Sequence, residues 1–314
     1  MRSFFYYLGS QLWSFLSMLA RWAAGRGFLK VTRLPVRVVG VGNLQVGGAG
    51  KTPLVAFLAK QALLRGKQVL VLTRGYGGNW ERSGGVISPS DTVDVTQTGD
   101  EAALIHALAP QVWIGIGADR VLQWERVLAR GFRPDFVILD DSFQHWKIAK
   151  DLEIIALTSR ERGEVFFRDW PRALKNADLV VWTKGDHLPW MPSDLPWCRI
   201  RYRLPAPPPG EARIVLVTGV ADGEQVRKTL VDEGYQIARH HVYADHAVYE
   251  RAAVEAILIQ AEREILDVAV TGKDWVKWKA LGLSPSQFGR ILVLEPELEW
   301  LEGRDTWNRV VWGE

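Results

Sequence analysis

The stretch from Val36 to Thr52 constrains the fold more than any other, because it predicts a strand, a glycine-rich loop and the start of a helix in that order. The β-branched residues Val36, Val38, Val39 and Val41 predict the strand. The loop reads Gly47-Gly48-Ala49-Gly50-Lys51-Thr52, and a helix-compatible stretch runs from Pro53 to Arg65. Pro53 fits a first helical turn, which has no use for the missing N–H. This order of elements is the context in which phosphate-binding loops occur.

The glycine-rich loop predicts an ATP site. Small residues let backbone N–H groups surround a polyphosphate, and a helix N-terminus adds partial positive charge. We expect Lys51 to reach the β- and γ-phosphates and the Thr52 hydroxyl to bind Mg²⁺. Gln45 stands where the first glycine of the pattern belongs, and a glycine-rich hairpin that carries a lysine is the alternative. The expected nucleotide-binding residues are Gln45, Val46, Gly47, Gly48, Ala49, Gly50, Lys51 and Thr52.

Length and composition favour a folded protein of one large or two medium domains. The chain has 314 residues, of which 47% are hydrophobic and 24% charged, so a substantial core is expected. A net charge of +3 and the lack of a basic block argue against a nucleic-acid partner. The single Cys198 excludes an intramolecular disulfide and a cysteine-rich metal site.

The N-terminal stretch from Ser3 to Ala20 carries no charge, is rich in aromatic residues and leucine, and is flanked by Arg2 and Arg21. A cleaved signal peptide conflicts with a site for cytosolic ATP. A spanning helix would be barely long enough. We expect a helix that lies on the membrane surface, where the cationic flank favours anionic headgroups, and a helix packed into the core is the alternative.

Two further clusters of polar residues follow predicted strands. Strand 68–73 leads into Arg74-Gly75-Tyr76-Gly77-Gly78, and ligands of open α/β sheets bind at such strand ends, so Arg74 and Tyr76 are substrate-binding candidates. Strand 136–139 leads into Asp140 and Asp141, and acids at this position hold Mg²⁺ in phosphate-loop proteins. Adjacent aspartates point to opposite sides of a strand, so the pair has either two roles or a strand break between them. His145 follows directly.

The second half predicts a smaller α/β lobe. Strands are expected at 152–157, 179–183, 213–218 and 267–271, and helices at 224–233 and 249–264. The proline-rich segment 204–211 is the clearest linker. We therefore predict a phosphate-loop NTPase-type α/β fold with a mostly parallel sheet, divided into an N-terminal membrane-associated helix (1–33), a phosphate-loop domain (34–203), the linker (204–211) and a smaller α/β domain (212–314). His246, in a loop of this domain, is expected to approach the reaction centre.

The chain resembles the tetraacyldisaccharide 4'-kinase family of Gram-negative bacteria along nearly its whole length. The motifs that carry the resemblance are VGNLQVGGAGKTP (41–53), RGYGG (74–78), GDEA (99–102), ADR (118–120), DDSFQH (140–145), NAD (176–178), VTGVAD (217–222), ADHAVY (244–249) and TGKDWVK (271–277). The resemblance implies transfer of the ATP γ-phosphate to the 4'-hydroxyl of an acylated glucosamine disaccharide 1-phosphate. It also implies a place on the cytosolic face of the bacterial inner membrane, peripheral or anchored by the N-terminus.

The resemblance also implies roles for single residues. Asp100 matches the acid that acts as base toward the sugar hydroxyl, although local sequence alone favours a helix-cap carboxylate. Lys51, Thr52, Asp140 and Asp141 match the nucleotide and Mg²⁺ positions. The residues that match substrate positions are Asn43, Arg120, Gln144 and His145. The chain departs from the family pattern at Gln45, Ser142, Gly272 and the segment 166–172, where Arg172 is the uncertain match.

Two other functions stay open from sequence alone. Thr183-Lys184-Gly185-Asp186 follows a predicted strand and mimics the guanine-reading pattern of GTPase switches. A membrane-bound ATPase without a small-molecule substrate is the second alternative. That class often carries lysine just before the Gly-Gly of its phosphate loop, where this chain has Val46.

Overall fold

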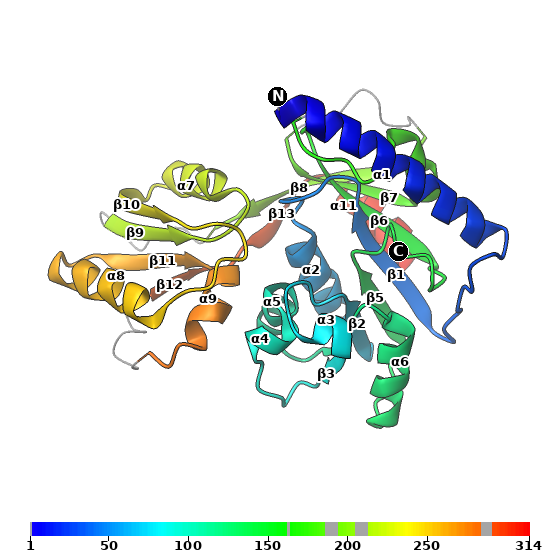
Figure 1. The fold of residues 1–314 in the computed structure, drawn as a ribbon, viewed down its shortest axis with the longest axis horizontal. Coiled ribbons are helices and arrows are strands. Elements are labelled where there is room, and N and C mark those ends of the chain that lie inside the picture. The colour runs from blue at the N-terminus through cyan, green and yellow to red at the C-terminus, as the bar shows by residue number, and fades with distance from the viewer. Residues whose placement is uncertain (1, 162–163, 186–193, 205–212, 284–290) are drawn as a thin grey trace.

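The structure, a computed structural model, describes residues 2–161, 164–185, 194–204, 213–283 and 291–314. Two β-sheets lie side by side, and helices cover them (Figure 1). The predicted proline-rich linker falls almost entirely on 205–212, outside the described residues. The α/β class and the largely parallel sheet are confirmed.

The larger sheet has nine strands among the described residues, in the order β13-β8-β7-β6-β1-β5-β2-β4-β3. All neighbouring pairs are parallel except the two edge pairs, β13 with β8 and β3 with β4. The strands are β1 (Arg37–Asn43), β2 (Val69–Thr73), β3 (Gly85–Ile87), β4 (Trp113–Ile116), β5 (Phe136–Asp140), β6 (Leu152–Thr158), β7 (Leu179–Lys184), β8 (Trp197–Arg203) and β13 (Glu297–Glu302).

Helices cover both faces of the central strands, so those strands are hydrophobic on both sides. Val39 and Val71 belong to the core that includes α2 and α5, whereas Val38 and Leu70 belong to the core that includes α6. This alternation follows from the pleat of a strand. The helices of this part are α1 (Arg2–Gly25), α2 (Lys51–Leu64), α3 (Trp80–Ser83), α4 (Val95–Thr98), α5 (Asp100–Leu108), α6 (Arg120–Ala129), the 3₁₀-helix η1 (Pro171–Asn176), α11 (Arg304–Trp307) and the π-helix η2 (Asn308–Trp312).

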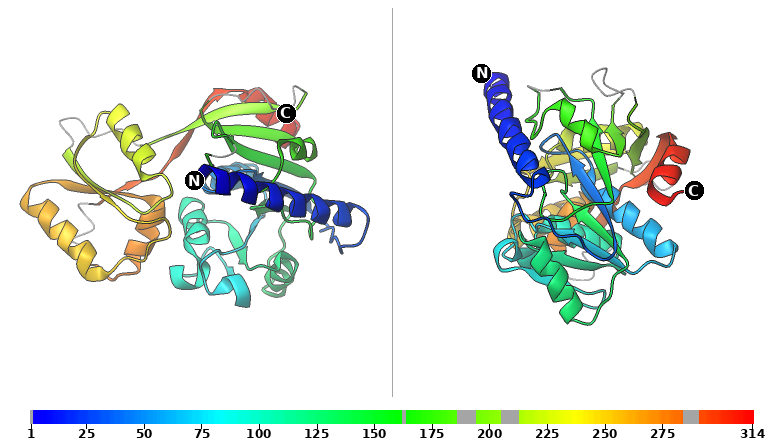
Figure 2. Two further views of the ribbon diagram at one scale, coloured as in Figure 1. Left: turned by 45° about the horizontal axis from the view of Figure 1, so that its top comes forward. Right: turned by 90° about the vertical axis from the view of Figure 1, so that its right-hand side faces the viewer.

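The smaller sheet is parallel, in the order β10-β9-β11-β12. Its strands are β9 (Arg213–Thr218), β10 (Gln236–Val242), β11 (Asp267–Thr271) and β12 (Ile291–Leu294). Its helices are α7 (Gly223–Asp232), α8 (Arg251–Arg263) and α9 (Gly272–Lys279). The views in Figure 2 show that β8 and β13, at one edge of the large sheet, extend toward the small sheet. Helix α9 packs against α5 of the larger part.

The C-terminal boundary of the predicted small domain is wrong. Residues 212–314 were expected to form one lobe, but the chain leaves the small sheet after β12 and pairs β13 with β8 in the large sheet. Trp307 and Val311 then join the core formed by α2 and the central strands. The Trp307 and Trp312 indole N–H groups both donate to Gln61 of α2, at 2.8 and 3.1 Å. Burial of these tryptophan side chains stabilises the return of the chain to the large sheet. The sequence alone does not show where they are buried.

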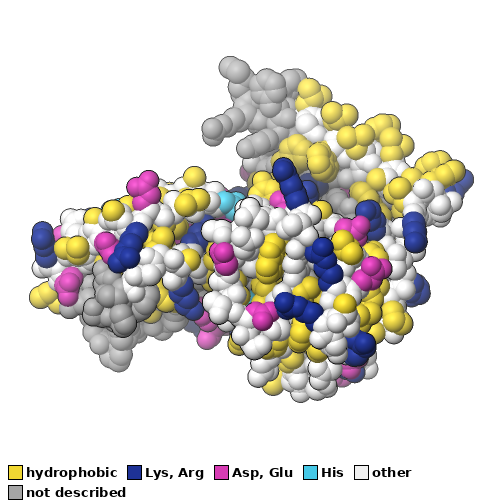
Figure 3. Space-filling model, turned by 60° about the horizontal axis from the view of Figure 1, so that its bottom comes forward, with side chains coloured by type: hydrophobic (Ala, Val, Ile, Leu, Met, Phe, Trp, Pro, Cys, Tyr) yellow, Lys and Arg dark blue, Asp and Glu magenta, His cyan; other side chains and the backbone are white. Residues whose placement is uncertain are grey.

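Helix α1 turns a polar stripe toward the protein. Ser10, Ser14 and Ser17 are at most 4% exposed and lie on one helical face. Ser10 Oγ accepts a hydrogen bond from the Phe167 N–H at 2.8 Å, and Ser17 Oγ donates to the Arg168 carbonyl at 3.0 Å. Apolar side chains face outward instead and gather along α1 in Figure 3. Those exposed by 43–64% are Tyr7, Leu8, Leu12, Trp13, Phe15, Leu16, Leu19 and Trp22.

This polarity is the reverse of an ordinary surface helix, which buries its apolar face. The alternative of a helix packed apolar-side into the core is therefore not what the structure shows. Among the described residues, no helix combines the length and apolar character that a bilayer span requires. Attachment to a membrane surface stays a prediction.

Candidate active site

The glycine-rich loop has the backbone shape that phosphate binding needs. Gly47, Gly48 and Gly50 have φ angles of 80°, 65° and 64°, in the left-handed region that glycine adopts without strain. Helix α2 begins at Lys51, with Gly50 as its N-cap. Free N–H groups of the loop and of the first helical turn therefore point to one place, and the dipole of α2 favours an anion there.

Gln45 shapes the loop through its side chain. Its amide nitrogen donates to the carbonyls of Thr158 and Arg160 at 3.0 and 2.7 Å, and its Oε1 accepts from the Thr158 N–H at 2.9 Å and from the Thr158 hydroxyl at 3.0 Å. The residue is 1% exposed. Gln45, at a position where the usual pattern has glycine, thus connects the loop to the end of β6. Because its side chain makes these bonds, only the Gln45 backbone is still predicted to contact the nucleotide.

The loop is also supported from β7 and β8. The Thr183 hydroxyl donates to the carbonyl of Ala49 at 3.0 Å, and the Tyr202 hydroxyl donates to the carbonyl of Gly50 at 2.7 Å. Lys184 Nζ lies close to Gly48, 3.9 Å from where a Cβ would stand. Two residues of the GTPase-like pattern therefore contact or adjoin the phosphate loop, and Asp186 of that pattern lies outside the described residues.

Lys51 lies in a cluster with two predicted site residues and one unexpected arginine. Its ammonium donates to Asn43 Oδ1 at 3.2 Å and to Asp141. Arg168 donates two hydrogen bonds to the Asp141 carboxylate, at 2.7 and 2.8 Å, and another to Asn43. Burial would raise the pKa of Asp141, but the charge of Lys51 and the hydrogen bonds from Arg168 hold that pKa well below its ordinary value.

Arg168 is the site residue that sequence reasoning missed. An antiparallel bridge between Gln45 and Phe167 lays the segment alongside the end of β1, and the Arg168 N–H donates to the Leu44 carbonyl at 2.7 Å. Arg172, the uncertain match to the family pattern, lies instead over the ring of Trp170 at 4.4 Å. No local signal distinguished the two arginines, because the bridge joins residues far apart in sequence.

The two aspartates at the end of β5 differ in backbone conformation and in hydrogen-bond partners. Asp140 ends the strand and Asp141 has a φ of 50°, so the strand breaks between them. Asp140 accepts hydrogen bonds from the Thr73 hydroxyl at 2.8 Å and from the Asp141 N–H at 2.9 Å. Burial raises the pKa of Asp140, against the opposing charge of Lys51. Asp140 is therefore a buried carboxylate with neutral hydrogen-bond donors.

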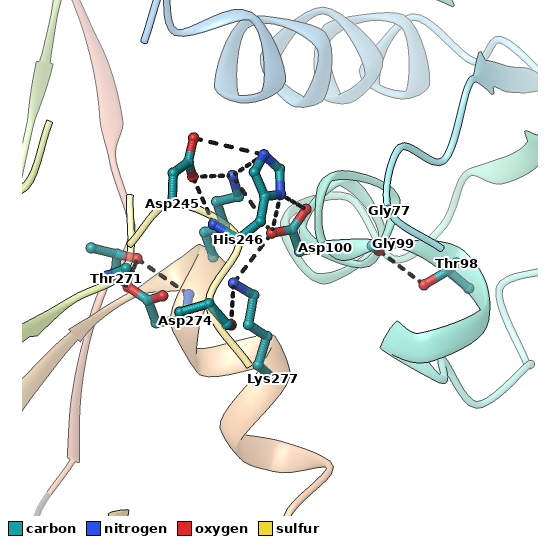
Figure 4. Close-up of polar contacts among 12 residues, drawn as sticks. Gly77, Thr98, Gly99, Asp100, Asp245, His246, Thr271, Asp274 and Lys277 are labelled. Carbon is teal, nitrogen blue, oxygen red and sulfur yellow. Dashed lines mark hydrogen bonds and ion pairs between the residues drawn. The ribbon is translucent and has the colours of Figure 1, made fainter. Parts of the chain in front are cut away.

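Asp100 begins α5 and is 4% exposed. Three groups of the small part surround its carboxylate: His246 Nδ1 lies 3.0 Å from Oδ2, Lys277 Nζ 3.3 Å and Lys273 Nζ 3.5 Å from the same oxygen (Figure 4). Tight backbone packing fixes the approach to α5, because a Cβ on Gly78 would lie 2.4 Å from the Gly99 nitrogen. The structure thus brings together Asp100 and His246, two of the predicted catalytic residues.

Glu101 connects this group with the phosphate-loop side. Burial, and next the charge of Asp140, raise the pKa of Glu101 to about 7, and the charges of Lys51, Lys273 and Asp100 also act on it. One carboxyl group is therefore within electrostatic range of both clusters.

A cavity of about 320 Å³ lies between α1 and the strand ends. Four of the six predicted substrate-binding residues line it: Arg74, Arg120, Gln144 and His145. The other lining residues are Trp13, Leu16, Ser17, Ala20, Asp141, Trp146 and Arg168. Its wall is therefore cationic on the sheet side and largely apolar on the α1 side.

The other two predicted substrate residues are not among the residues that line this cavity. Asn43 contacts both Lys51 and Arg168, while the exposed Tyr76 ring packs edge-on against His246, with 5.4 Å between ring centroids. Among the described residues, no cluster of three or more His, Cys, Asp or Glu side chains forms a ready metal site.

Comparison with known proteins shows similarity to one family along nearly the whole chain. The sequence model of the family described as tetraacyldisaccharide-1-P 4'-kinase matches residues 3–311. The tetraacyldisaccharide 4'-kinase of Geobacter metallireducens is 33% identical over 308 residues, with 89% of each chain covered. That of Geobacter sulfurreducens is 34% identical over 292 residues, covering 86% of this chain and 82% of the relative. A crystal structure of LpxK from Aquifex aeolicus in complex with ATP matches with a TM-score of 0.79 and 25% identity, covering 100% of this chain and 99% of that one.

Proposed function

The chain belongs to the tetraacyldisaccharide 4'-kinase family, and from this premise we propose how its residues transfer the γ-phosphate of ATP to the 4'-hydroxyl of tetraacyldisaccharide 1-phosphate. The product is lipid IVA, an intermediate of lipid A biosynthesis. One observation supports this reading most: the charges of both Lys51 and Asp100 act on the buried Glu101, and a cavity lined by Asp141 and Arg168 reaches α1.

The nucleotide part of the proposal uses main-chain groups and one lysine. N–H groups from Gly47 to Thr52 would surround the β-phosphate at the N-terminus of α2. Lys51 would leave Asp141 and bind the γ-phosphate, where it offsets the charge that develops during transfer. Arg168 would then keep Asp141 oriented through its two hydrogen bonds.

The residues at the end of β5 fit Mg²⁺. Asp140 is a buried carboxylate whose hydrogen-bond donors are neutral, so a cation would relieve the cost of its burial. Hard oxygen ligands and nucleotide phosphates suit Mg²⁺, and Thr52, Asp140 and Asp141 would hold it. When bound, Mg²⁺ neutralises charge on the phosphates.

Asp100 acts as the base in this proposal. As the 4'-oxygen bonds to the γ-phosphorus, its O–H bond breaks and the proton passes to an Asp100 oxygen. The bond from the γ-phosphorus to the β,γ-bridging oxygen breaks, and ADP leaves. Positioning and charge neutralisation supply most of the rate in such transfers, so a carboxylate of ordinary strength is an adequate base.

The cavity fits an acylated, phosphorylated sugar. Arg120 is 6% exposed, and its buried side-chain Nε has no hydrogen-bond partner among the described residues. Burial lowers the pKa of Arg120, while the charges of Asp141 and Asp140 oppose that shift. A buried guanidinium N–H without a partner favours an anionic or polar ligand. The apolar α1 side of the cavity would receive acyl chains.

Helix α1 would hold the cavity at the membrane surface. Its inward polar stripe and outward Trp, Phe and Leu side chains suit the boundary between headgroups and acyl chains. The cytosolic face of the inner membrane is the side that has ATP.

A pair of variants tests membrane attachment through α1. Leu12→Glu with Leu16→Glu should abolish sedimentation with anionic vesicles, whereas Ser90→Glu should not. Equal sedimentation of both would contradict membrane attachment through α1.

The activity is tested with purified protein, labelled ATP and the acylated disaccharide. The proposal predicts label on the disaccharide and little ATP hydrolysis without it. Competition between ATP and GTP addresses the GTPase alternative, which the similarity to the kinases does not favour. Preference for GTP, or hydrolysis that ignores the disaccharide, would contradict the proposal.

A further inference from the structure

The proposed base, Asp100, is surrounded by side chains from the part of the molecule that contains the small sheet. Asp100 lies on α5, but its charged neighbours Lys273 and Lys277 lie on α9, and His246 lies on the loop before α8. All three are largely buried or half-buried, with side-chain exposures of 15%, 11% and 34%. In Figure 4, His246 lies between Asp245 and Asp100, and Lys277 approaches Asp100 from the other side.

The two ring nitrogens of His246 meet different chemistry. Nδ1 faces the Asp100 carboxylate, 3.2 Å from Oδ1 and 3.0 Å from Oδ2. Nε2 faces the ammonium of Lys273 at 3.4 Å. Asp245 Oδ2 lies farther from Nε2, at 3.7 Å, and its carboxylate is itself paired with Lys273 at 2.8 Å. The ring is set in this place by an unusual backbone, because His246 has a φ of 62°.

The donor inventory of these neighbours decides where the imidazole proton lies. An ammonium only donates, so Nε2 accepts a hydrogen bond from Lys273. An ionised carboxylate only accepts, so Nδ1 carries the proton and donates it to Asp100. Both neighbours require the same tautomer.

We propose that Lys273 is a positioning residue of the kinase: by donating to Nε2 of His246, it fixes the tautomer whose Nδ1–H orients the Asp100 carboxylate. This inference rests on the proposed function. In this tautomer Nδ1 has no free lone pair, so His246 cannot take the proton from Asp100. The proton of the sugar hydroxyl therefore stays on Asp100 during the transfer, and His246 acts by orientation.

Lys277 provides a matched control. It also brings a positive charge close to Asp100, but its hydrogen bond goes to the carbonyl of Ala247 at 3.2 Å, and no hydrogen bond or ion pair joins it to His246 among the described residues. Lys277→Met thus removes a positive charge near Asp100. Lys273→Met removes such a charge and also the hydrogen bond that fixes the tautomer of His246. Lys273→Arg keeps a donor that cannot accept.

The direct test is the nitrogen NMR spectrum of the histidine side chains of the full-length protein at pH 8.5, above the ordinary imidazole pKa of about 6.5. His246→Gln identifies the signals of His246. The wild type and Lys277→Met should show protonated Nδ1, and Lys273→Arg should retain that pattern. Lys273→Met should show a mixture of tautomers. Protonated Nε2 in the wild type, or an unchanged pattern in Lys273→Met, would overturn the proposal, and the first of these outcomes requires no unstable variant.

Kinetics supply the second test. Lys273→Met should lower kcat about 10- to 100-fold with little change in the KM for ATP, a fraction of what a general base contributes. In a His246→Gln background the same change should cost only a few-fold, because the residue through which it acts is gone. An equal loss in both backgrounds would overturn the proposal. The NMR test needs no substrate, so absence of disaccharide phosphorylation in the wild type would refute the proposed function separately.

Discussion

His145 should make the folded protein sensitive to mild acid. Its side chain lines the cavity and is 8% exposed. Burial, and then the charges of Arg120, Lys150 and Lys147, lower its pKa from 6.5 to about 3. The folded state therefore holds this imidazole neutral at a pH at which the unfolded chain protonates it.

The sign and size follow from linkage. A histidine whose pKa is lowered by folding does not change the free energy of unfolding above pH 6.5. That free energy falls as the pH drops from 6.5 toward 3. At pH 5.5, protonation of the imidazole in the unfolded chain multiplies the unfolding equilibrium constant by about 11, which is about 1.4 kcal/mol. Protonation of the folded state has almost no effect at this pH. His145 should thus lower the free energy of unfolding by about 1.4 kcal/mol between pH 7.5 and pH 5.5.

The assay is urea unfolding followed by tryptophan fluorescence at the two pH values. His145→Gln keeps a polar side chain but cannot titrate, so its loss between pH 7.5 and 5.5 should be about 1.4 kcal/mol smaller than that of the wild type. His241→Gln is the comparison variant, because burial and next the charge of Arg239 lower the pKa of the half-buried His241, which does not line the cavity. If the wild type and His145→Gln lose the same free energy, the assignment of a buried neutral imidazole is wrong.

Three further changes test the phosphate-loop side. Gln45→Ala leaves the buried N–H of Thr158 without its partner and should lower the free energy of unfolding by about 1–3 kcal/mol, measured by urea unfolding; no change would show that the loop is held otherwise. Lys51→Ala should weaken ATP binding in calorimetry and abolish turnover, and normal turnover would exclude it from the site. Arg168→Met should lower kcat at least about 10-fold, since charged hydrogen bonds to Asp141 are each worth about 1.5–3 kcal/mol, whereas Arg172→Met should change it little. The reverse order would favour the match to the family pattern over the observed geometry.

Local patterns were sufficient for the elements that carry the site. The valine-rich strand, the glycines and the following helix appear as β1, a loop with left-handed glycines and α2 beginning at Lys51. Of the two alternatives for the aspartate pair, two roles or a strand break, the positive φ of Asp141 supports the strand break. These features depend on hydrophobic periodicity and on backbone sterics, which act over a few residues.

Three features that depend on distant segments were not predicted. Arg168 enters the site only because its segment bridges to Gln45, more than a hundred residues away in the chain. Lys273 and Lys277 reach Asp100 only because α9 packs on α5. The return of β13 to the large sheet likewise depends on a pairing partner, β8, that was not predicted as a strand. Sequence spacing carries no signal for such contacts.

The most direct test of the account is the turnover of Asp100→Ala with labelled ATP and the acylated disaccharide, measured together with the Kd for ATP. The account predicts a loss on the order of 10²–10⁴-fold in phosphate transfer with an unchanged Kd, because Asp100 serves the sugar hydroxyl and not the nucleotide. Near-normal transfer by Asp100→Ala would contradict the assignment of this buried carboxylate as the base.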